Sequence, residues 1–178
     1  MDKVENERCP MCQEKKMTLI EDEKEIPYFG KVFLFSMDCS KCNFHKADIE
    51  SAEFREPCRI IFEANSEKDM HVRVVKSAEA HVKIPTLRMD VRPGPASNGY
   101  ITNVEGILNR FEKIIQEQKE AADAEGDKAV KTTAKNLLKK IWKIKCGDMP
   151  VKIVIEDPTG NSAIISEKTV IEKLKVKK

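Results

Sequence analysis

Residues 37–45 read MDCSKCNFH, and this stretch places Cys39 and Cys42 two residues apart with His45 close behind. A pair with this spacing can belong to a metal site, a redox-active dithiol or a catalytic Cys/His arrangement. An earlier stretch, CPMC at residues 9–12, supplies a second pair with the same spacing. Two such pairs favour the metal site, because each C-x2-C can form a tight turn that points both sulfurs at one ion.

Four thiolates from two such turns would complete a tetrahedral zinc site. We therefore predict one structural Zn²⁺ held by Cys9, Cys12, Cys39 and Cys42. Four sulfurs leave no open coordination position, so a catalytic zinc is not expected. His45 could in principle replace a cysteine, but we expect it to face solvent or to lie beside the ligands. The redox alternative is weaker, since a redox C-x-x-C normally lies where a strand leads into a helix and neither pair here does.

The 26 residues between Cys12 and Cys39 are predicted to form a β-hairpin. KMTLIED leaves the metal site and KVFLFSM returns to it, and both stretches are strand-like. Near the far end of this hairpin lie Pro27, Tyr28 and Phe29. Exposed aromatic residues make good interface anchors, so these three are candidates for partner contact. The alternative, that they pack the hairpin against the rest of the chain, stays equally open.

The composition describes a chain of 178 residues with 40% hydrophobic and 35% charged residues, which predicts a hydrophobic core and a highly charged surface. The net charge of +2 is too small to indicate a nucleic-acid-binding protein by itself. The N-terminus is polar and has no apolar segment typical of a secretory signal, so we expect a cytoplasmic protein with reduced thiols. Cys58 and Cys146 lack partners at ligand spacing and are expected to be free and packed as small apolar residues.

Beyond the second cysteine pair, the sequence predicts strands, then two helices, then further strands. Valines alternate with polar residues around Val72–Ile84, with the period of two that strands with one buried face show. Apolar residues then recur at helical spacing over 102–120 and again over about 128–145. Thr102 and Glu105 have the spacing of a capping box at the start of the first helix. A short connection between two amphipathic helices predicts a helical hairpin at about 102–146.

The late strands, VKIVIE at 151–156 and SAIIS at 162–166, need partners that only the earlier sheet can supply. We therefore expect a zinc-binding domain at residues 1–50 and a β-rich domain at 51–178 with the helical hairpin inserted into it.

Five phrases, in chain order, resemble those of the ZPR-type zinc-finger protein family: CPMC, IPYFGKVFLFSMDCSKC, VVKSAEAHVKIPTL, TNVEGIL and EDPTGNS. The resemblance runs from the first cysteine pair to the turn before the last predicted strand, and VVKSA, TNVEG and DPTGNS are its most specific parts. The chain is similar to single-module archaeal members. It departs from the family at Asn43, where glycine is usual, but asparagine also tolerates the left-handed backbone that often follows such a turn.

The resemblance implies an α+β, mainly β fold: an N-terminal zinc ribbon followed by a double-stranded β-helix (jelly-roll-like) domain with an inserted helical hairpin. It also implies a partner, because eukaryotic relatives bind the GTPase translation elongation factor one-alpha and assist its folding. Our leading hypothesis is a zinc-binding protein-interaction module with this kind of partner.

RNA binding and catalysis are the two other classes of function. An RNA-binding zinc-ribbon protein is the alternative, since the basic stretch KNLLKKIWKIK encloses Trp142. However, Trp142 falls on the apolar stripe of its helix, so we expect it to lie in the core and the lysines beside it to form a solvated face. An enzyme is not expected, because His71 and His81 lack metal-ligand spacing and the chain has no P-loop or G-x-S-x-G motif.

Overall fold

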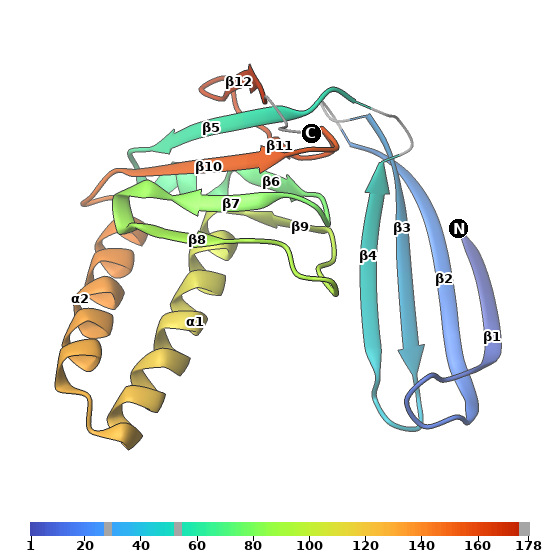
Figure 1. Ribbon diagram of the computed structural model, residues 1–178. Helices are drawn as coiled ribbons and strands as arrows, with labels where there is room; N and C mark the ends of the chain where they lie inside the picture. The colour runs from blue at the N-terminus through green and yellow to red at the C-terminus, as the bar shows by residue number, and fades with distance from the viewer. Residues whose placement is uncertain (27–29, 52–54, 175–178) are drawn as a thin grey trace.

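The computed structural model describes residues 1–26, 30–51 and 55–174, so the predicted contact residues Pro27, Tyr28 and Phe29 lie outside the described residues. The described chain is mainly β (Figure 1). It comprises an N-terminal four-stranded sheet, a β-rich domain of two further sheets and a pair of helices that extends from that domain. The α+β, mainly β fold predicted from the sequence is confirmed.

The N-terminal sheet is the zinc ribbon, and its strands are hydrogen-bonded in chain order. They are β1 (Asp2–Arg8), β2 (Lys15–Ile26), β3 (Gly30–Cys39) and β4 (His45–Ser51). The predicted hairpin is the β2–β3 pair, which is in register from Met17 opposite Cys39 to Ile26 opposite Gly30. β1 was not foreseen, because all seven of its residues are exposed and its sequence carries no alternation of apolar and polar residues.

The β-rich domain contains one sheet in the order β12-β5-β10-β7-β8 and a second in the order β11-β6-β9. The strands are β5 (Cys58–Ala64), β6 (Arg73–Lys76), β7 (His81–Ile84), β8 (Met89–Val91), β9 (Tyr100–Asn103), β10 (Val151–Asp157), β11 (Ala163–Ile164) and β12 (Val170–Lys173), with 3-10 turns η1 (Glu67–His71) and η2 (Pro85–Leu87). β10 lies between β5 and β7 and is antiparallel to both. The late strand therefore pairs with the earlier ones, as the sequence predicted.

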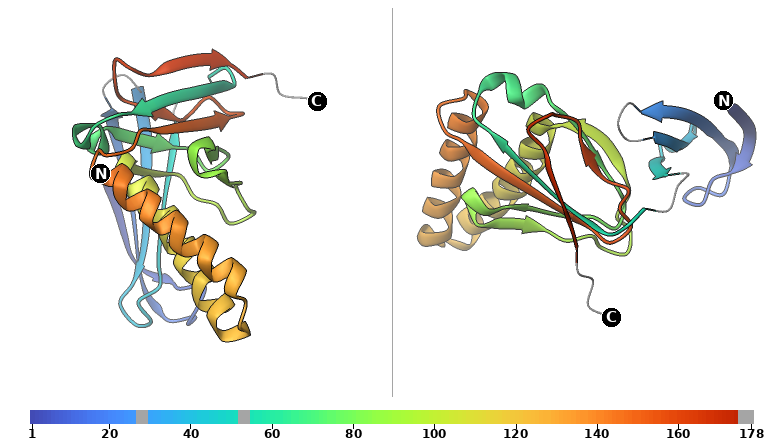
Figure 2. Two further views of the ribbon diagram at one scale, coloured as in Figure 1. Left: turned by 90° about the vertical axis from the view of Figure 1, so that its left-hand side faces the viewer. Right: turned by 90° about the horizontal axis from the view of Figure 1, so that it is seen from above.

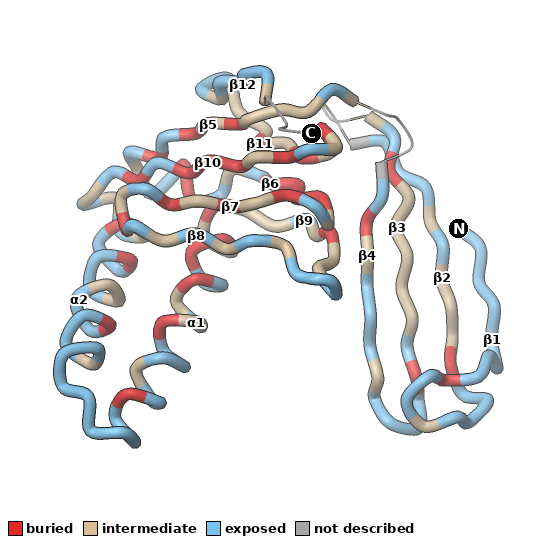
Figure 3. The backbone as a smooth tube through the Cα atoms, viewed as in Figure 1, coloured by how far each residue is buried: buried red, intermediate tan, exposed pale blue. Residues whose placement is uncertain are grey.

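The main core draws its buried side chains from both sheets and from the helices. β10 alone contributes Val151, Ile153 and Ile155, all fully buried, and buried positions recur along the facing strands (Figure 3). Because both sheets present apolar residues to this one interior, they pack face to face as in a sandwich.

The helical hairpin consists of α1 (Val104–Glu125) and α2 (Lys128–Lys145), joined by a tight turn. Gly126 takes a left-handed φ of 77° at the end of α1, and the Asp127 carboxylate then accepts hydrogen bonds from the backbone N–H groups that open α2. Ion pairs Lys131–Asp123 and Lys145–Glu112 link the two helices. The predicted hairpin is confirmed.

The start of α1 differs from the predicted capping box. Thr102 lies in β9, opposite Val74 of β6, and is not the residue that caps the helix. Asn103 caps it instead, its side-chain oxygen accepting the Gly106 N–H at 2.7 Å. β9 leads directly into α1, and Thr102 is part of the strand because it pairs with β6. The capping-box prediction was therefore wrong.

Two predictions of burial, one on α2 and one at the residue that follows it, were also wrong. Trp142 is 63% exposed, and Cys146 is exposed as well. In the last part of α2, the buried side chains are those of Ile141 and Ile144. Because α2 packs mainly against α1, the face of the helix that is buried is narrower than the apolar stripe in its sequence. Cys58 does pack partly against the core, where burial raises the pKa of its thiol to about 11.

Among the described residues, the contacts that anchor the ribbon to the jelly-roll-like domain lie at one end of the ribbon. Val32 and Ile49 of the ribbon form a buried cluster with Val75 of β6. The Asp48 carboxylate also accepts the backbone N–H of Gly99 at 2.8 Å. From this anchor the ribbon extends away from the domain, at the opposite side from the helical hairpin (Figures 1 and 2).

Neither helix in the described part of the chain is long and apolar enough to cross a membrane.

Candidate metal centre

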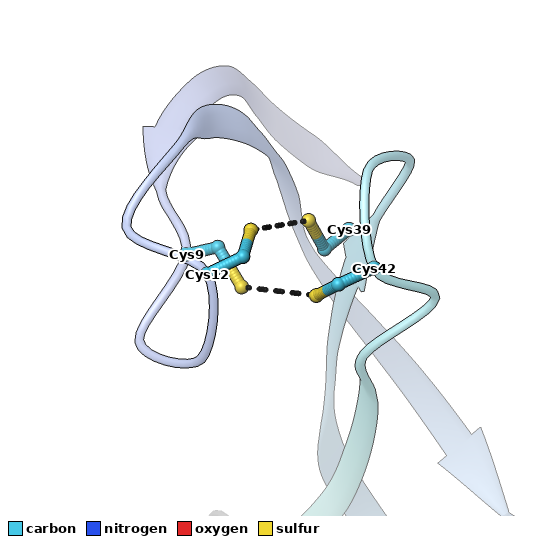
Figure 4. Close-up of side chains that lie close together, drawn as sticks. All are labelled: Cys9, Cys12, Cys39 and Cys42. Carbon is cyan, nitrogen blue, oxygen red and sulfur yellow. Dashed lines mark hydrogen bonds between the residues drawn. The ribbon is translucent and has the colours of Figure 1, made fainter.

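The four cysteines of the two C-x2-C pairs converge at the free end of the ribbon (Figure 4). The Cys9 and Cys42 sulfurs are 3.7 Å apart, the Cys12 and Cys39 sulfurs are also 3.7 Å apart, and all four lie within 4.8 Å of one another. Zn–S bonds of about 2.3 Å in a tetrahedron place the sulfurs about 3.8 Å apart. The donor set therefore fits one Zn²⁺ in both chemistry and size.

Each cysteine pair lies in a turn with the same hydrogen bonds. In the first turn, Cys9 donates its N–H to the Glu14 carbonyl and accepts one from Gln13. In the second, Cys39 donates to Phe44 and accepts from Asn43 in the same way. Gln13 and Asn43 take left-handed φ values of 64° and 56°, so the asparagine predicted to tolerate this backbone does so. Two equivalent turns thus present their thiols to each other.

Little hydrophobic core surrounds these sulfurs. The buried cluster at this end of the ribbon consists of Cys9, Met17 and Cys39, with Leu19, Met37 and Phe44 packed at its edge. Hydrogen bonding from the Cys42 backbone lowers the pKa of the Cys39 thiol to about 7. Because the thiolate is the form that binds metal, binding of Zn²⁺ by these thiols releases protons.

His45 lies beside the site without joining the four-cysteine group. It opens β4 and places its Nδ1 2.6 Å from the Asp38 carboxylate, at an exposed position. This partner holds the pKa of Asp38 below its usual range. The prediction that His45 is not a ligand agrees with this placement, since the grouped ligand atoms are the four sulfurs.

The other two histidines lie in the β-rich domain. His71 is exposed at the end of η1. His81 Nε2 lies 2.7 Å from Asp90 on the neighbouring strand β8. Both therefore lie away from the four-cysteine group.

Two of the family-specific phrases meet inside the jelly-roll-like domain, which the sequence could not show. Ser162 of DPTGNS accepts the Ser77 backbone N–H of VVKSA at 3.0 Å and donates to the Asp157 carboxylate at 2.5 Å. Asp157, fully buried, also accepts hydrogen bonds from Thr159. These residues fix the end of β10 against β6, so their contacts here are structural.

Two family models match this chain, one after the other along the sequence. The ZPR1 zinc-finger domain matches residues 4–57, and the ZPR1 jelly-roll domain matches residues 68–178. A ZPR1-like protein of Methanocaldococcus jannaschii is 39% identical over 168 residues, which cover 94% of this chain and 83% of that protein. A ZPR1-like protein of Pyrococcus horikoshii is 34% identical over 167 residues, which cover 93% of this chain and 75% of that protein.

Eukaryotic relatives are matched over a smaller share of their length. A fission yeast protein (Schizosaccharomyces pombe) named zinc finger chaperone zpr1 is 32% identical over 141 residues, which cover 78% of this chain and 30% of that protein. The fold and the cysteine centre define a zinc-ribbon protein with a jelly-roll domain. The chain belongs to the ZPR1 family, and its cofactor is one Zn²⁺.

Proposed function

We propose that this protein binds a translation elongation factor GTPase of the one-alpha type in the cytoplasm and assists its folding. The observation that carries the proposal is membership of the family to which the fission yeast zinc finger chaperone belongs. The elongation factor is the partner that the resemblance to ZPR-type proteins implies, and the phrases VVKSA, TNVEG and DPTGNS carry that resemblance. The task is recognition of another protein rather than catalysis.

The zinc ion would be held by Cys9, Cys12, Cys39 and Cys42. When bound, it joins the two turns at the tip of the ribbon, and such sites contribute on the order of 10 kcal/mol to folding. The tip has little core of its own, so zinc is what gives it one defined surface. Val32, near the anchor, is seven residues along β3 from Cys39, so the metal lies about 23 Å from the anchor by strand rise. A rigid projecting tip is suited to contacting a second protein.

The helical hairpin offers the second contact surface. Trp142 is the largest exposed apolar side chain in the described chain, and it stands on an element that extends away from both sheets (Figure 2). Tryptophan is among the residues most enriched at the centres of protein interfaces. Pro27, Tyr28 and Phe29, the candidates from the sequence, remain part of the proposed contact surface.

Refolding of the GTPase tests this function. The chemically denatured elongation factor is diluted into buffer with an equimolar amount of zinc-loaded protein, and recovery of GTP binding is followed with a fluorescent nucleotide. We expect the wild type to raise the recovered fraction and Trp142→Ala to raise it less. An equal recovery with the wild type and with serum albumin would contradict the chaperone proposal.

RNA binding is the second candidate function. It is favoured by the exposure of Trp142, which the sequence had predicted to be buried. Lys139, Lys140 and Lys143 are exposed around an exposed Trp142, and cations beside an aromatic ring can bind single-stranded nucleic acid. Such binding would weaken steeply with salt. Fluorescence anisotropy with a labelled single-stranded RNA at low and high salt decides it: no binding at low salt removes this candidate.

A further inference from the structure

A pocket of about 200 Å³ lies between α1, the strands β6–β9 and the loop that follows β8. Its walls are mainly hydrocarbon, from Val82, Val91, Ile107, Phe111 and Ile114. A cavity of about 150 Å³ is large enough to hold benzene, so this pocket has room for a ring or branched chain and a small polar group. Neither the zinc site nor the proposed partner surface includes it.

The floor of the pocket carries a buried cation. Lys76 is 4% exposed, and its ammonium donates to the Ser77 carbonyl at 2.8 Å and, at 3.4 Å each, to the Ala78 carbonyl and the Ser97 hydroxyl. Among the described residues, no carboxylate lies within ion-pair distance of this ammonium. A buried ammonium without a paired anion is costly, and burial accordingly lowers the pKa of Lys76.

The acidic groups that stabilise the charge of Lys76 electrostatically lie beyond ion-pair distance from its ammonium. They are Asp157, Glu79 and Asp48, and the Arg110 charge opposes them. Since Asp157 is already engaged with Ser162 and Thr159, its lone pairs are committed elsewhere. The charge of Lys76 is thus partly compensated by its surroundings but has no direct partner.

Tyr100 forms a wall of the pocket between two cations. The Lys76 ammonium lies 5.4 Å from its ring centroid, and the Arg110 guanidinium carbon lies 3.9 Å from the same centroid. Arg110 is exposed, and in the described part of the chain it too lacks an ion pair. Stacking on Tyr100 holds the guanidinium at the pocket rim, where its N–H groups can bind a carboxylate in bidentate fashion.

We propose that this pocket binds a small carboxylate with an apolar body. The carboxylate lies between Lys76, Ser97 and Arg110, and the apolar body packs against Ile107 and Phe111. Phosphate is disfavoured, because it has no apolar portion to pack against these walls. The same chemistry can come from a free organic acid or from the apolar C-terminal residue of a peptide.

The test uses the full zinc-loaded chain labelled with ¹⁵N and follows backbone amide shifts during titration. Benzoate should shift the amides of Ser97, Tyr100 and Arg110, whereas neutral benzamide should shift them at least about tenfold less at equal concentration. N-acetyl-leucine mimics a peptide C-terminus, so its affinity relative to benzoate distinguishes the two sources. Inorganic phosphate is added as a competitor and should not displace benzoate.

Variants separate the pocket from general charge. Arg110→Gln should weaken benzoate binding by roughly three- to tenfold, since it removes a charge-assisted hydrogen bond at the rim. Lys113→Gln makes the same change of charge on an exposed residue of α1 outside the pocket and should leave affinity unchanged. Lys76→Met should abolish binding, and Arg110→Gln keeps the test valid if that variant does not fold.

Three results would overturn the proposal. Equal binding of benzoate and benzamide would show that the cations play no part. Equal effects of Arg110→Gln and Lys113→Gln, or displacement of benzoate by phosphate, would exclude the assigned site or the assigned ligand class.

Discussion

At the scale of single residues, the tip of the ribbon has only a small hydrophobic cluster, and we expect metal binding by its four sulfur atoms to stabilise it instead. The buried cluster there contains only three residues of the described chain, and two of them are cysteines. A metal ion bound by thiolates is then the main cross-link between the β1–β2 and β3–β4 turns.

Replacing one ligand tests this view. Cys39→Ser should lower the zinc content from one ion per chain and loosen the ribbon tip, because serine is a poor zinc ligand and the two turns lose their cross-link. Zinc is measured by a colorimetric chelator after gel filtration, and the tip by amide hydrogen exchange. Cys146→Ser, at an exposed cysteine on the helical hairpin, is the matched control. A variant that retains one zinc ion with unchanged affinity would refute the assignment.

A second residue-scale prediction concerns Asp69, which is 6% exposed in η1. Its carboxylate accepts hydrogen bonds from Lys168, Asn65 and Ser66, with Lys168 the main cause of a pKa lowered to about 2. The unfolded-state pKa of an aspartate is about 3.9. The lowered pKa of Asp69 therefore stabilises the folded state by about 1–2 kcal/mol, after a reduction because its partner Lys168 is exposed to solvent. A depressed pKa stabilises the fold fully above the unfolded value, and this stability is lost as pH falls through the folded value.

Asp69→Asn should therefore lower the free energy of unfolding by about 1–2 kcal/mol at pH 6, and the difference from wild type should shrink between pH 4 and pH 2. Urea unfolding followed by circular dichroism measures both values, and zinc is removed from all samples so that its loss in acid does not enter. Asp123→Asn, at an exposed ion pair, should change stability by less than about 0.5 kcal/mol. A difference for Asp69→Asn that is independent of pH would contradict this account.

At the scale of elements, the helical hairpin shows which side chains are available to a partner. Adjacent residues on α2 have opposite environments: Ile141 is fully buried and Trp142 is 63% exposed. Because the two residues are adjacent on one helix turn, substituting each in turn distinguishes a contribution to stability from a contribution to partner binding.

Ile141→Ala should destabilise the protein by about 2–5 kcal/mol, because it leaves a cavity in the core. Trp142→Ala should change stability by less than about 1 kcal/mol, since most of the tryptophan surface is exposed. Thermal unfolding of the two zinc-loaded variants makes the comparison. A larger loss for Trp142→Ala than for Ile141→Ala would mean that the tryptophan belongs to the core after all.

The sequence predicted the elements better than their edges. The two C-x2-C pairs, the β2–β3 hairpin and the two helices were predictable because each has a local signature: ligand spacing, alternation or helical periodicity. β1, β8, β9 and β12 were missed or merged, since their residues are exposed or their runs are short. Their place depends on which strand edges the fold leaves open.

For the site, spacing predicted the four cysteines but burial was harder to predict. Trp142 was predicted to be buried because its helix carries more apolar residues than α1 and η1 cover. The pairing of Ser162 with Ser77 and Asp157 joins positions up to 85 residues apart, so no local pattern could predict it. Lys76 reads as an ordinary strand lysine, and only tertiary structure places it inside a pocket.

At the scale of the whole molecule, the jelly-roll-like domain carries the ribbon and the helical hairpin at opposite sides, and the ribbon is held at a small anchor (Figures 1 and 2). Gly99 is central to that anchor. A Cβ added there would lie 2.4 Å from the Ile49 Cγ2 atom and 2.7 Å from the Ile49 carbonyl oxygen. Glycine is therefore required by close approach of the two parts, not by a turn.

Gly99→Ala should loosen the ribbon from the domain while leaving zinc bound, because the metal site lies at the other end of the ribbon. ¹⁵N relaxation should then give the ribbon a shorter rotational correlation time than the domain. Gly94→Ala is the matched control in the same loop, since a Cβ there meets nothing within 4 Å. Identical relaxation in the two variants would argue against the anchor.

Direct binding to the purified GTPase tests the central claim, that this is a zinc-dependent module for holding a translation elongation factor. Isothermal titration calorimetry is performed with the elongation factor of the one-alpha type from the same organism. We predict a complex with the zinc-loaded protein, a loss of affinity of roughly tenfold with Trp142→Ala, and no complex after zinc is removed. The absence of any complex with the zinc-loaded wild type, or equal affinity with and without zinc, would contradict the account.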